Sequence, residues 1–466
     1  MKLLKDQVTD VTVHVVYEDS QDETALALKE KTLFDGAADS HYAMLDENGH
    51  GTIYYGIGKE EDNDPYQATL YFYNLGRYLQ GLGINKIHLE VPDSFKEDEE
   101  FPGKTLEGLY QAEYRFDHYK TEKGDLIELE LSMDDYDYWK PTFDLVEKVA
   151  KAVFHARDLV NQRPLDLYPE TLAEQVRELF QETDVEVEIY DEDQIKSMGM
   201  EAFLQVAKGS DRPPRFIVLK YMPTDEKDHL TLVGKGMTYD SGGYAIKPGG
   251  SMETMHSDMA GAAAVVGGIY ALSTVGVKQN VVGVIAAAEN LIDGKAFKNG
   301  DIVSSMKGTT IEVNNTDAEG RLTLADAIYY AATKLNSKAI VDLATLTGAA
   351  IAAVGPRCTV MMSNEDELAD QILTASQNGA EPTQRLQAFP SHYKQIKGKF
   401  GDLDNAPKGG AGAITAGVFL EHFTEDIPWV HLDIAGPSYS KNAYDYLPQG
   451  ASGTGVKTLY RWIAAL

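Results

Sequence analysis

Cysteine is almost absent from this chain of 466 residues, which has a single one at Cys358. An intrachain disulfide and a metal cluster built on cysteines are therefore excluded, and we expect a reducing, cytoplasmic compartment. Basic residues are scarce too, because 42 lysines and arginines stand against 73 aspartates and glutamates and leave a formal net charge of −31. This charge repels phosphate backbones and anionic lipid, so we expect neither nucleic acid nor a membrane as a partner.

Apolar runs of membrane-spanning character are also scarce. The stretch up to Asp10 lacks the apolar core that a signal peptide needs, so we expect no secretory leader. Residues 259–277 carry no charge and are long enough to cross a bilayer. They consist mainly of glycine, alanine and valine, and they closely follow His256 and Asp258. We therefore expect a buried helix packed closely on a sheet.

The length of the chain and its apolar fraction of 43% predict two domains with sizeable cores. An amphipathic pattern at 144–161, limited by Pro164, predicts a long helix that joins them. Before it, strand patterns and one helical pattern lie at 11–17, 51–58, 66–82, 86–91 and 126–131.

Beyond residue 168, strand and helix patterns alternate, which predicts an α/β fold with helices on both faces of a layered sheet. These patterns lie at 216–219, 230–233, 281–287, 321–335, 340–343, 360–362, 366–377 and 430–434. We expect a smaller N-terminal α/β domain over 1–145, a linking helix over 146–165 and a larger C-terminal domain over 166–466.

Three segments of the second half place charges inside apolar or glycine-rich sequence. In the first, the strand pattern at 230–233 leads into a glycine-rich segment that we expect to be a loop carrying Lys235, Asp240 and Lys247. Glycines let such a loop turn tightly and approach a ligand. Because sites in α/β sheets are built at strand ends, these charges are candidate site residues.

The second segment places Asp258 at the start of the apolar helix, where a carboxylate could simply serve the helix dipole. In the third, Asp317, Glu319 and Arg321 alternate, so their side chains would share one face of an extended segment. An isolated pattern of this kind favours a surface ion pair. Its apolar flanks and its position between a strand and a helix favour a functional site instead.

Together these segments offer four carboxylates, at Asp240, Asp258, Asp317 and Glu319. Carboxylates that lie close together repel one another unless cations neutralise them. Two divalent ions about 3.5–4 Å apart would do so and would form a hydrolytic centre. Because cysteine and histidine are missing from the set, Mn²⁺, Mg²⁺ or a carboxylate-bound Zn²⁺ would suit it.

The three segments resemble those of the leucyl aminopeptidases, or cytosol aminopeptidases, and Asn314-Asn315-Thr316-Asp317-Ala318-Glu319-Gly320-Arg321-Leu322 matches their signature in full. The resemblance covers about residue 156 to the C-terminus and is weak before it. It implies a macro-like N-terminal domain and a catalytic domain with a mixed sheet. Four further motifs carry it: Ala156-Arg157-Asp158-Leu159-Val160-Asn161, Ala344-Thr345-Leu346-Thr347-Gly348-Ala349, Gly412-Ala413-Ile414-Thr415-Ala416-Gly417 and His431-Leu432-Asp433-Ile434-Ala435-Gly436.

The resemblance implies a metal-dependent aminopeptidase that hydrolyses the N-terminal residue, leucine and other mainly apolar residues, from peptides in intracellular peptide turnover. A water or hydroxide activated by two metal ions would be the nucleophile. The tighter ion would be bound by Lys235, Asp240, Asp258 and Glu319, and the more exchangeable ion by Asp240, Asp317 and Glu319. Lys235 would bind as a neutral amine, which nearby divalent ions favour.

The resemblance also assigns the other roles in the site. Lys247 would stabilise the developing oxyanion, and Arg321 would hold a bicarbonate as the general base. Leu346 and Gly348 would hold the substrate backbone, and Met255 would line the first side-chain pocket. The assembly would be a homohexamer, a dimer of trimers. One departure is the pair His256-Ser257 before Asp258, where the family has a basic residue followed by alanine.

Two other readings of the whole chain remain open. Some relatives have an architectural role on DNA, which the acidic first part of this chain disfavours. An inert scaffold is the other, and the complete ligand set disfavours it. Among weaker motifs, we expect residues 409–412 to form a flexible loop near the site and residues 402–405 to form a surface loop rather than a calcium loop.

Overall fold

The computed structural model describes residues 1–6, 9, 11–21, 23–32, 34–47, 49–62, 64–123 and 128–466. Its contacts divide the chain into two compact units. The N-terminal unit comprises Met1–Lys151 together with Ala443–Pro448, and the C-terminal unit comprises Ala152–Asn442 together with Gln449–Leu466. The expected two-domain α/β architecture is confirmed.

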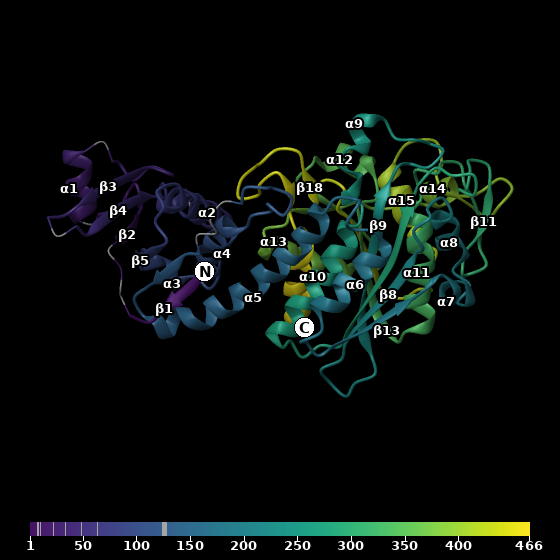
Figure 1. The fold of residues 1–466 in the computed structure, drawn as a ribbon, viewed down its shortest axis with the longest axis horizontal. Coiled ribbons are helices and arrows are strands. Elements are labelled where there is room, and N and C mark those ends of the chain that lie inside the picture. The colour runs from purple at the N-terminus through teal and green to yellow at the C-terminus, as the bar shows by residue number, and fades with distance from the viewer. Residues whose placement is uncertain are drawn as a thin grey trace. The chain divides into compact units, whose positions relative to one another are not determined.

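The N-terminal unit is built on a six-stranded sheet with the order β1-β6-β5-β2-β4-β3 (Figure 1). All neighbours are parallel except β3 and β4. The strands are β1 Lys2–Leu4, β2 Val11–Val16, β3 His41–Leu45, β4 Gly51–Gly56, β5 Lys86–Glu90 and β6 Glu130–Ser132. The strand pattern at 126–131 lies partly outside the described residues, and β6 overlaps its end.

One face of this sheet buries the unit's main core. Val13, Ile53, Ile87 and Leu131 alternate toward that face, where helices α2 and α4 cover them. Asp64 caps α2 by accepting the backbone N–H of Gln67, which explains where the helix begins. The helices are α1 Glu23–Lys31, α2 Pro65–Gly81, α3 Ser94–Glu97 and α4 Phe101–Glu113, with a 3₁₀ turn at Glu60–Asp62.

Helix α5, Tyr136–Asn161, passes from one unit into the other. It begins eight residues before the predicted start at residue 144, and Pro141 lies inside it. Pro141 is the sixth residue of the helix, so it lies just past the first turn and its missing N–H removes one intrahelical bond, to the carbonyl oxygen of Asp137.

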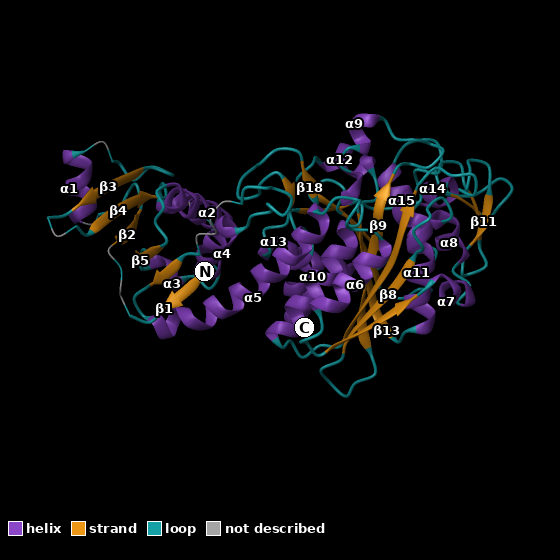
Figure 2. Cartoon of the chain, viewed as in Figure 1, coloured by secondary structure: helices purple, strands orange, loops and turns teal. Residues whose placement is uncertain are grey.

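The C-terminal unit contains a mixed eight-stranded sheet with the order β15-β14-β17-β13-β9-β10-β8-β7. Figure 2 labels its strands β8, β9 and β13. Its centre is parallel, from β17 through β13 and β9 to β10, and antiparallel pairs flank it. The strands are β7 Val185–Tyr190, β8 Arg215–Tyr221, β9 His229–Asp240, β10 Val281–Asn290, β13 Ser337–Ala344, β14 Thr359–Ser363, β15 Thr383–Arg385 and β17 Trp429–Asp433.

Helices cover both faces of this sheet, as predicted, and each face has its own core. One face packs against α6 Pro169–Leu179, α10 Ala260–Val275, α13 Asp366–Asn378 and α16 Val456–Ala464. The other packs against α7 Glu192–Ser197, α8 Glu201–Ala207, α11 Gly320–Lys334 and α15 Gly412–Glu421. The uncharged stretch at 259–277 forms α10, which is almost wholly buried. Among the described residues, none of the helices has the length and apolar character needed to cross a membrane.

Smaller elements complete the C-terminal unit around the end of β9. They are β11 Ile302–Ser304, β12 Thr310–Glu312 and β16 Leu403–Asp404, which form a three-stranded sheet, and the pair β18 Tyr439–Ser440 and β19 Gly450–Ala451. Short helices lie at α9 Gly249–Met252, α12 Gly348–Val354 and α14 Pro390–Gln395, and a 3₁₀ turn lies at Met255–Ser257.

Candidate metal centre

Two candidate residues lie on β9, between β10 and β13 in the middle of the sheet. Lys235 and Asp240 are both buried there. We expected them in a loop after a shorter strand, which is wrong because β9 continues to Asp240. The glycines that suggested a loop serve close packing instead, since a Cβ at Gly234 would lie 2.6 Å from the Cα of Ala262 in α10. Small residues thus bring α10 against β9 beside Lys235.

Lys247 lies in the loop after β9, as predicted. The turn is tight, with Gly242 at a φ of 84°, and the N–H of Gly242 donates to Asp240 Oδ1 at 2.9 Å. The turn returns Lys247 to the end of the strand. Its Nζ lies 2.7 Å from Asp240 Oδ2 and 2.6 Å from Asp317 Oδ1.

Asp258 lies between the 3₁₀ turn at 255–257 and the start of α10. Its carboxylate does not cap the helix. Oδ1 accepts the hydroxyl of Thr345 at 2.6 Å, and Oδ2 lies 2.8 Å from Lys235 Nζ. The alternative interpretation of Asp258 as a partner of the helix dipole therefore does not explain where this side chain points.

Asp317 and Glu319 lie in a turn that leads directly into α11. We expected an extended segment, and this is wrong because Glu319 already has helical backbone angles (φ −77°, ψ −36°). The two carboxylates nevertheless converge with Asp240, since one oxygen of each of these three residues lies within 4.8 Å of the others. Glu319 Oε1 also lies 2.9 Å from Lys235 Nζ.

A fully buried asparagine, Asn405, holds this turn in place. Its Oδ1 accepts the backbone N–H groups of Asn314 and Asn315, and its Nδ2 donates to the carbonyl oxygens of Asn315 and Ala318. The expectation of a surface loop at residues 402–405 is wrong, because β16 pairs with β12 there and buries Asn405. The Asn405 side chain therefore holds the backbone of the turn that carries Asp317.

The electrostatics of the cluster reflect burial and close charges. Burial raises the pKa values of Asp258, Asp317 and Glu319, and the neighbouring charge of Asp240 adds to the effect. Burial acts to lower the pKa of Lys235, but the carboxylates of Asp258 and Glu319 outweigh it and hold the pKa above its ordinary value. Bound divalent ions would reverse these directions, because they favour carboxylates and neutral amines.

Arg321 is the second residue of α11 and is buried beside the cluster. Its Nη1 donates to the carbonyl oxygen of Asn405 at 2.6 Å, and its guanidinium lies 5.9 Å from the ring centroid of Phe419. Burial lowers its pKa to about 10. Its Nε is buried and has no hydrogen-bond partner among the described residues. An unpaired N–H donor of this kind can bind an anion.

The candidate substrate residues border the cluster on two sides. Leu346 and Gly348 follow the end of β13, and the carbonyl oxygen of the adjacent Thr345 accepts Lys235 Nζ at 3.1 Å. The N–H of Leu346 donates to Asp433 Oδ1 at 3.1 Å. Met255 is partly buried in the 3₁₀ turn before Asp258.

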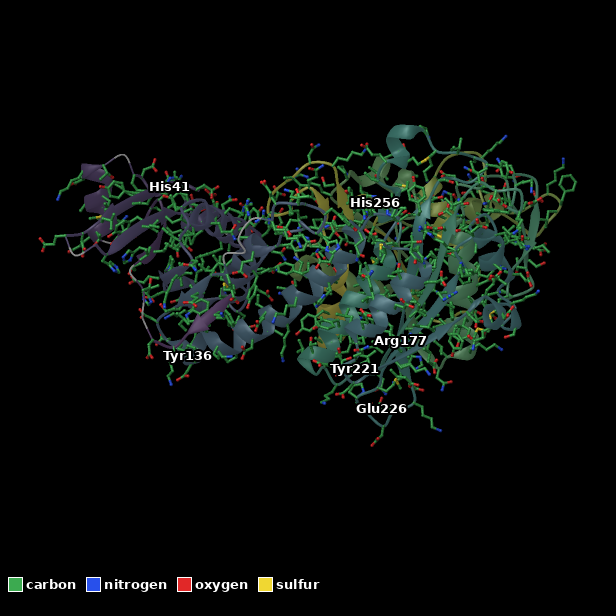
Figure 3. The ribbon with its side chains drawn as sticks, in the orientation of Figure 1. His41, Tyr136, Arg177, Tyr221, Glu226 and His256 are labelled. Carbon is green, nitrogen blue, oxygen red and sulfur yellow. The ribbon has the colours of Figure 1, made fainter. Side chains whose placement is uncertain are left out.

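His256 is the departure from the family pattern, and Figure 3 labels it. Its ring packs edge-on against Tyr439, with ring centroids 5.3 Å apart. Burial lowers the pKa of His256, which favours the neutral imidazole. The histidine therefore supplies an aromatic contact where a basic residue would supply a charge.

Three supporting residues were missed from the sequence. Asn290 ends β10 and donates to Asp240 Oδ1 at 2.8 Å, Thr345 donates to Asp258, and Asn405 supports the turn. One signal was visible for Asn290, since it follows the strand pattern at 281–287 and strand ends carry sites. A single neutral asparagine or threonine carries no comparable signal elsewhere.

The chain matches the descriptions "Cytosol aminopeptidase family, catalytic domain" over residues 154–460 and "Cytosol aminopeptidase family, N-terminal domain" over residues 11–123. Two similar curated proteins are both described as probable cytosol aminopeptidases. The one from Clostridium tetani is 42% identical over 441 residues, covering 93% of this chain and 92% of its own. The one from Treponema denticola is 40% identical over 448 residues, covering 93% of each.

Solved structures agree over nearly the whole chain. The bottromycin maturation enzyme BotP in complex with Mn superposes with a TM-score of 0.88 at 30% identity, covering 98% of this chain and 99% of that one. A mutant of tomato leucine aminopeptidase has a TM-score of 0.88 at 29% identity, covering 100% and 96%. With both domains matched and relatives 40% identical over most of its length, the chain belongs to the cytosol aminopeptidase family and is a hydrolase of the metalloexopeptidase type.

Proposed function

We propose that this protein removes the N-terminal residue, leucine and other mainly apolar residues, from peptides with the help of two divalent metal ions. The observation that carries the proposal is the convergence of Asp240, Asp317 and Glu319 on one point, with one oxygen of each within 4.8 Å of the others. Lys235 and Lys247 offset part of the repulsion among these carboxylates, and divalent ions suit such a cluster of oxygens.

The donor set fits two ions. Glu319 Oε2 is buried and has no hydrogen-bond partner among the described residues, which leaves a lone pair directed into the cluster. Lys235, Asp240, Asp258 and Glu319 would hold one ion, and Asp240, Asp317 and Glu319 the other. Two such ions, Mn²⁺, Zn²⁺ or Mg²⁺, would supply Lewis-acid polarisation and a water of lowered pKa. BotP, which is similar in fold, forms a complex with Mn.

Lys247 would donate to the carbonyl oxygen of the scissile bond and stabilise the charge that develops there. Lys247 is suited to this role because its ammonium lies next to Asp240 and Asp317. It reaches them from a loop rather than from the sheet. Burial acts to lower the pKa of Lys247, but the charges of Asp240 and Glu319 outweigh it and keep the side chain charged.

Arg321 would hold a bicarbonate ion, which would supply the general base. The buried and unpaired Nε, next to an Nη1 that is already anchored on Asn405, leaves one edge of the guanidinium free for a planar anion. The cation is held rigidly, and a lysine could not present two parallel donors in this way.

The substrate would enter with its free α-amine toward the more exchangeable ion, which restricts cleavage to the first residue. Leu346 would accept a substrate N–H through its carbonyl, while its own N–H binds Asp433. Gly348 would allow the substrate backbone to approach, since no atom lies within 4 Å of a Cβ placed there. Met255 would line the pocket for an apolar side chain. We place this activity in peptide turnover in the cytoplasm, in a homohexamer built as a dimer of trimers.

The test is hydrolysis of leucine p-nitroanilide by the Mn²⁺-loaded protein. We expect turnover in the wild type, loss of it in Asp317→Ala, and wild-type turnover in the matched control Asp228→Ala, whose side chain is 59% exposed. An inactive wild type that retains its metal, or an Asp317→Ala variant with full turnover, would contradict the proposal. Metal analysis of the same samples separates an inert scaffold from a metal-loaded enzyme.

A further inference from the structure

Thr316, which directly precedes Asp317, has a fully buried side chain and is not among the candidate metal ligands. It lies in the turn between β12 and α11. Its hydroxyl group binds the loop of residues 241–247, which follows β9 and carries Lys247. One buried hydroxyl therefore joins the turn that carries Asp317 to the loop that carries Lys247.

The hydroxyl of Thr316 both donates and accepts a hydrogen bond in this loop. It donates to the carbonyl oxygen of Gly242 at 2.7 Å and accepts the backbone N–H of Ala245 at 2.8 Å. The loop contains neither helix nor strand, so no regular ladder pairs these groups. A backbone group that loses its partner away from water costs free energy, so the two bonds stabilise the loop in one conformation.

Two consecutive glycines allow the loop to approach Thr316 closely. Gly242 and Gly243 have φ angles of 84° and 59°, in the left-handed region that favours glycine. A Cβ at Gly243 would lie 3.1 Å from Thr316 Oγ1. The loop backbone therefore packs directly on the threonine, and a shift of the loop would break at least one of the two hydrogen bonds.

The backbone of Thr316 is itself fixed by two asparagines. Its N–H donates to Asn299 Oδ1 at 3.1 Å, and its carbonyl oxygen accepts Asn290 Nδ2 at 3.0 Å. Asn290 Nδ2 also donates to Asp240 Oδ1 at 2.8 Å. Thr316 is thus held against the ends of β9 and β10, and its hydroxyl fixes the loop relative to the same strand ends.

Lys247 closes the other end of the loop. Its backbone N–H donates to the carbonyl oxygen of Ser241 at 3.0 Å. Its ammonium lies 2.7 Å from Asp240 Oδ2 and 2.6 Å from Asp317 Oδ1. Both carboxylates are proposed metal ligands, so bound cations would compete with the ammonium for their oxygens. The hydrogen bonds of the loop would then determine where Lys247 lies.

We propose that Thr316 is a positioning residue that fixes Lys247 through the loop of residues 241–247. The inference rests on the proposed function, in which Lys247 donates to the carbonyl oxygen of the scissile bond. Stabilising a developing charge needs a donor placed in advance, and a displacement of about 1 Å can lower the rate by roughly 100-fold. Loss of the hydroxyl should therefore lower kcat more than it changes KM.

The experiment compares Thr316→Val, which keeps the shape of the side chain and removes the hydroxyl, with Thr316→Ser, which keeps the hydroxyl. Steady-state kinetics with leucine p-nitroanilide and metal content are measured on the Mn²⁺-loaded, full-length protein. We expect Thr316→Val to lower kcat by roughly 10- to 100-fold with little change in KM and unchanged metal content. Thr316→Ser should retain most of the wild-type turnover.

Hydrogen exchange followed by mass spectrometry reports on the loop independently of turnover. The Ala245 amide loses its acceptor in Thr316→Val, so this amide should exchange about fivefold faster or more, whereas Thr316→Ser should exchange as the wild type does. The matched control is Thr69→Val. Thr69 is also fully buried, and its hydroxyl donates to the carbonyl oxygen of Pro65 within α2. This control should keep wild-type kinetics and wild-type exchange of the loop.

A folded Thr316→Val variant with wild-type kcat and wild-type loop exchange would overturn the proposal, as would a Thr316→Ser variant that is equally impaired. Loss of metal from Thr316→Val would place the effect at Asp317 and would also contradict it. Thr316→Ala, which leaves space for water, replaces Thr316→Val if circular dichroism shows that the latter is unfolded. A wild type without turnover would contradict the proposed function, whereas the exchange measurement would still decide whether the hydroxyl holds the loop.

Discussion

Arg321 Nη1 donates to the carbonyl oxygen of Asn405 at 2.6 Å, while the side chain of the same asparagine binds the backbone of the turn that carries Asp317. One buried residue thus sets the position of both the cation and a carboxylate of the centre. Its backbone serves Arg321 and its side chain serves the turn, so substitutions can separate the two effects.

We predict that Asn405→Ala lowers kcat by roughly 10- to 100-fold, the range usual for residues that support metal ligands. The backbone bond to Arg321 survives, but the turn loses all of its contacts with the side chain amide. The exposed Asn378→Ala is the matched control and should retain wild-type turnover. Steady-state kinetics and metal content are the measurements. If Asn405→Ala keeps both kcat and metal, the turn is held by other contacts.

Thr345→Val tests the hydroxyl that donates to Asp258 Oδ1 at 2.6 Å. The change keeps the shape of the side chain and removes only the donor, so Asp258 loses its fixed orientation. We predict that the affinity for the tighter ion falls by roughly 10- to 100-fold. Competition with a fluorescent chelator measures this affinity. Thr333→Val, whose hydroxyl bonds only within α11, should bind metal as the wild type does.

Lys235→Met tests how the centre is neutralised. Lys235 is buried between Asp258 and Glu319, at 2.8 and 2.9 Å. Without metal, its removal leaves buried carboxylates unpaired, a change that typically costs about 3–5 kcal/mol. We predict a lower melting temperature for Lys235→Met than for wild type, with a larger difference in chelator than in Mn²⁺. Equal differences in the two conditions would show that the metal does not replace the charge of the lysine.

The apolar framework of the C-terminal unit could be predicted from sequence, because its central strands are buried on both faces and form continuous apolar runs such as Val281–Asn290. The three-stranded sheet of β11, β12 and β16 could not, since strands of two or three residues leave no periodic pattern. Lys235 and Asp240 were recognised as candidates but assigned to a loop, because glycines that serve close packing and glycines that serve turns look alike in sequence.

The candidate metal centre could also be predicted only in part from the sequence. Four carboxylates in apolar surroundings could be recognised because their burial demands a cation. Asn405 could not, since its importance comes from long-range contacts, such as that with the backbone of Ala318, and Asn290 gave only the general signal of a residue at a strand end. Charged residues in apolar sequence indicate a site, because burying a charge costs free energy. Neutral amides give no such signal, and their role can be recognised only once the fold shows their hydrogen-bond partners.

The pair His431 and Asp342 predicts a pH dependence of stability. His431 Nδ1 lies 2.7 Å from Asp342 Oδ1, and both side chains are buried. Burial acts to lower the pKa of His431, but the charge of Asp342 and its hydrogen bond outweigh burial and hold the pKa above its ordinary value. A raised folded pKa stabilises the protein fully below the unfolded pKa, about 6.5, and this stabilisation is lost as pH rises through the folded value.

We therefore predict that the free energy of unfolding of the wild type falls above about pH 6.5 relative to that of His431→Gln. Denaturant titrations between pH 6 and 9 at constant metal concentration measure the difference. His41→Gln changes an exposed histidine and should follow the wild type. Parallel curves for wild type and His431→Gln would show that Asp342 does not hold His431 in its charged form.

Substitution of Gly242 distinguishes the effect of backbone strain from the effect of the geometry of the candidate metal centre. Its φ is 84°, and a Cβ there would lie 2.7 Å from Asp317 Oδ1. Gly276 has a similar φ of 88° with no atom within 4 Å of such a Cβ. Both alanine variants therefore bear the left-handed strain, roughly 1–2 kcal/mol, but only Gly242→Ala also meets neighbouring atoms, the carbonyl oxygen of Ala245 at 2.6 Å and Oδ1 of Asp317.

We predict a larger loss of stability in Gly242→Ala than in Gly276→Ala, because only the former also meets the backbone of Ala245, and a fall in kcat only in Gly242→Ala, by as much as about 100-fold, because catalytic groups tolerate little displacement. Thermal unfolding and steady-state kinetics with leucine p-nitroanilide are measured on the same samples. Equal turnover in the two variants would mean that the turn relaxes without moving Asp317. A fall in both would place the effect in global stability, since Gly276 lies at the end of α10 rather than beside the carboxylates.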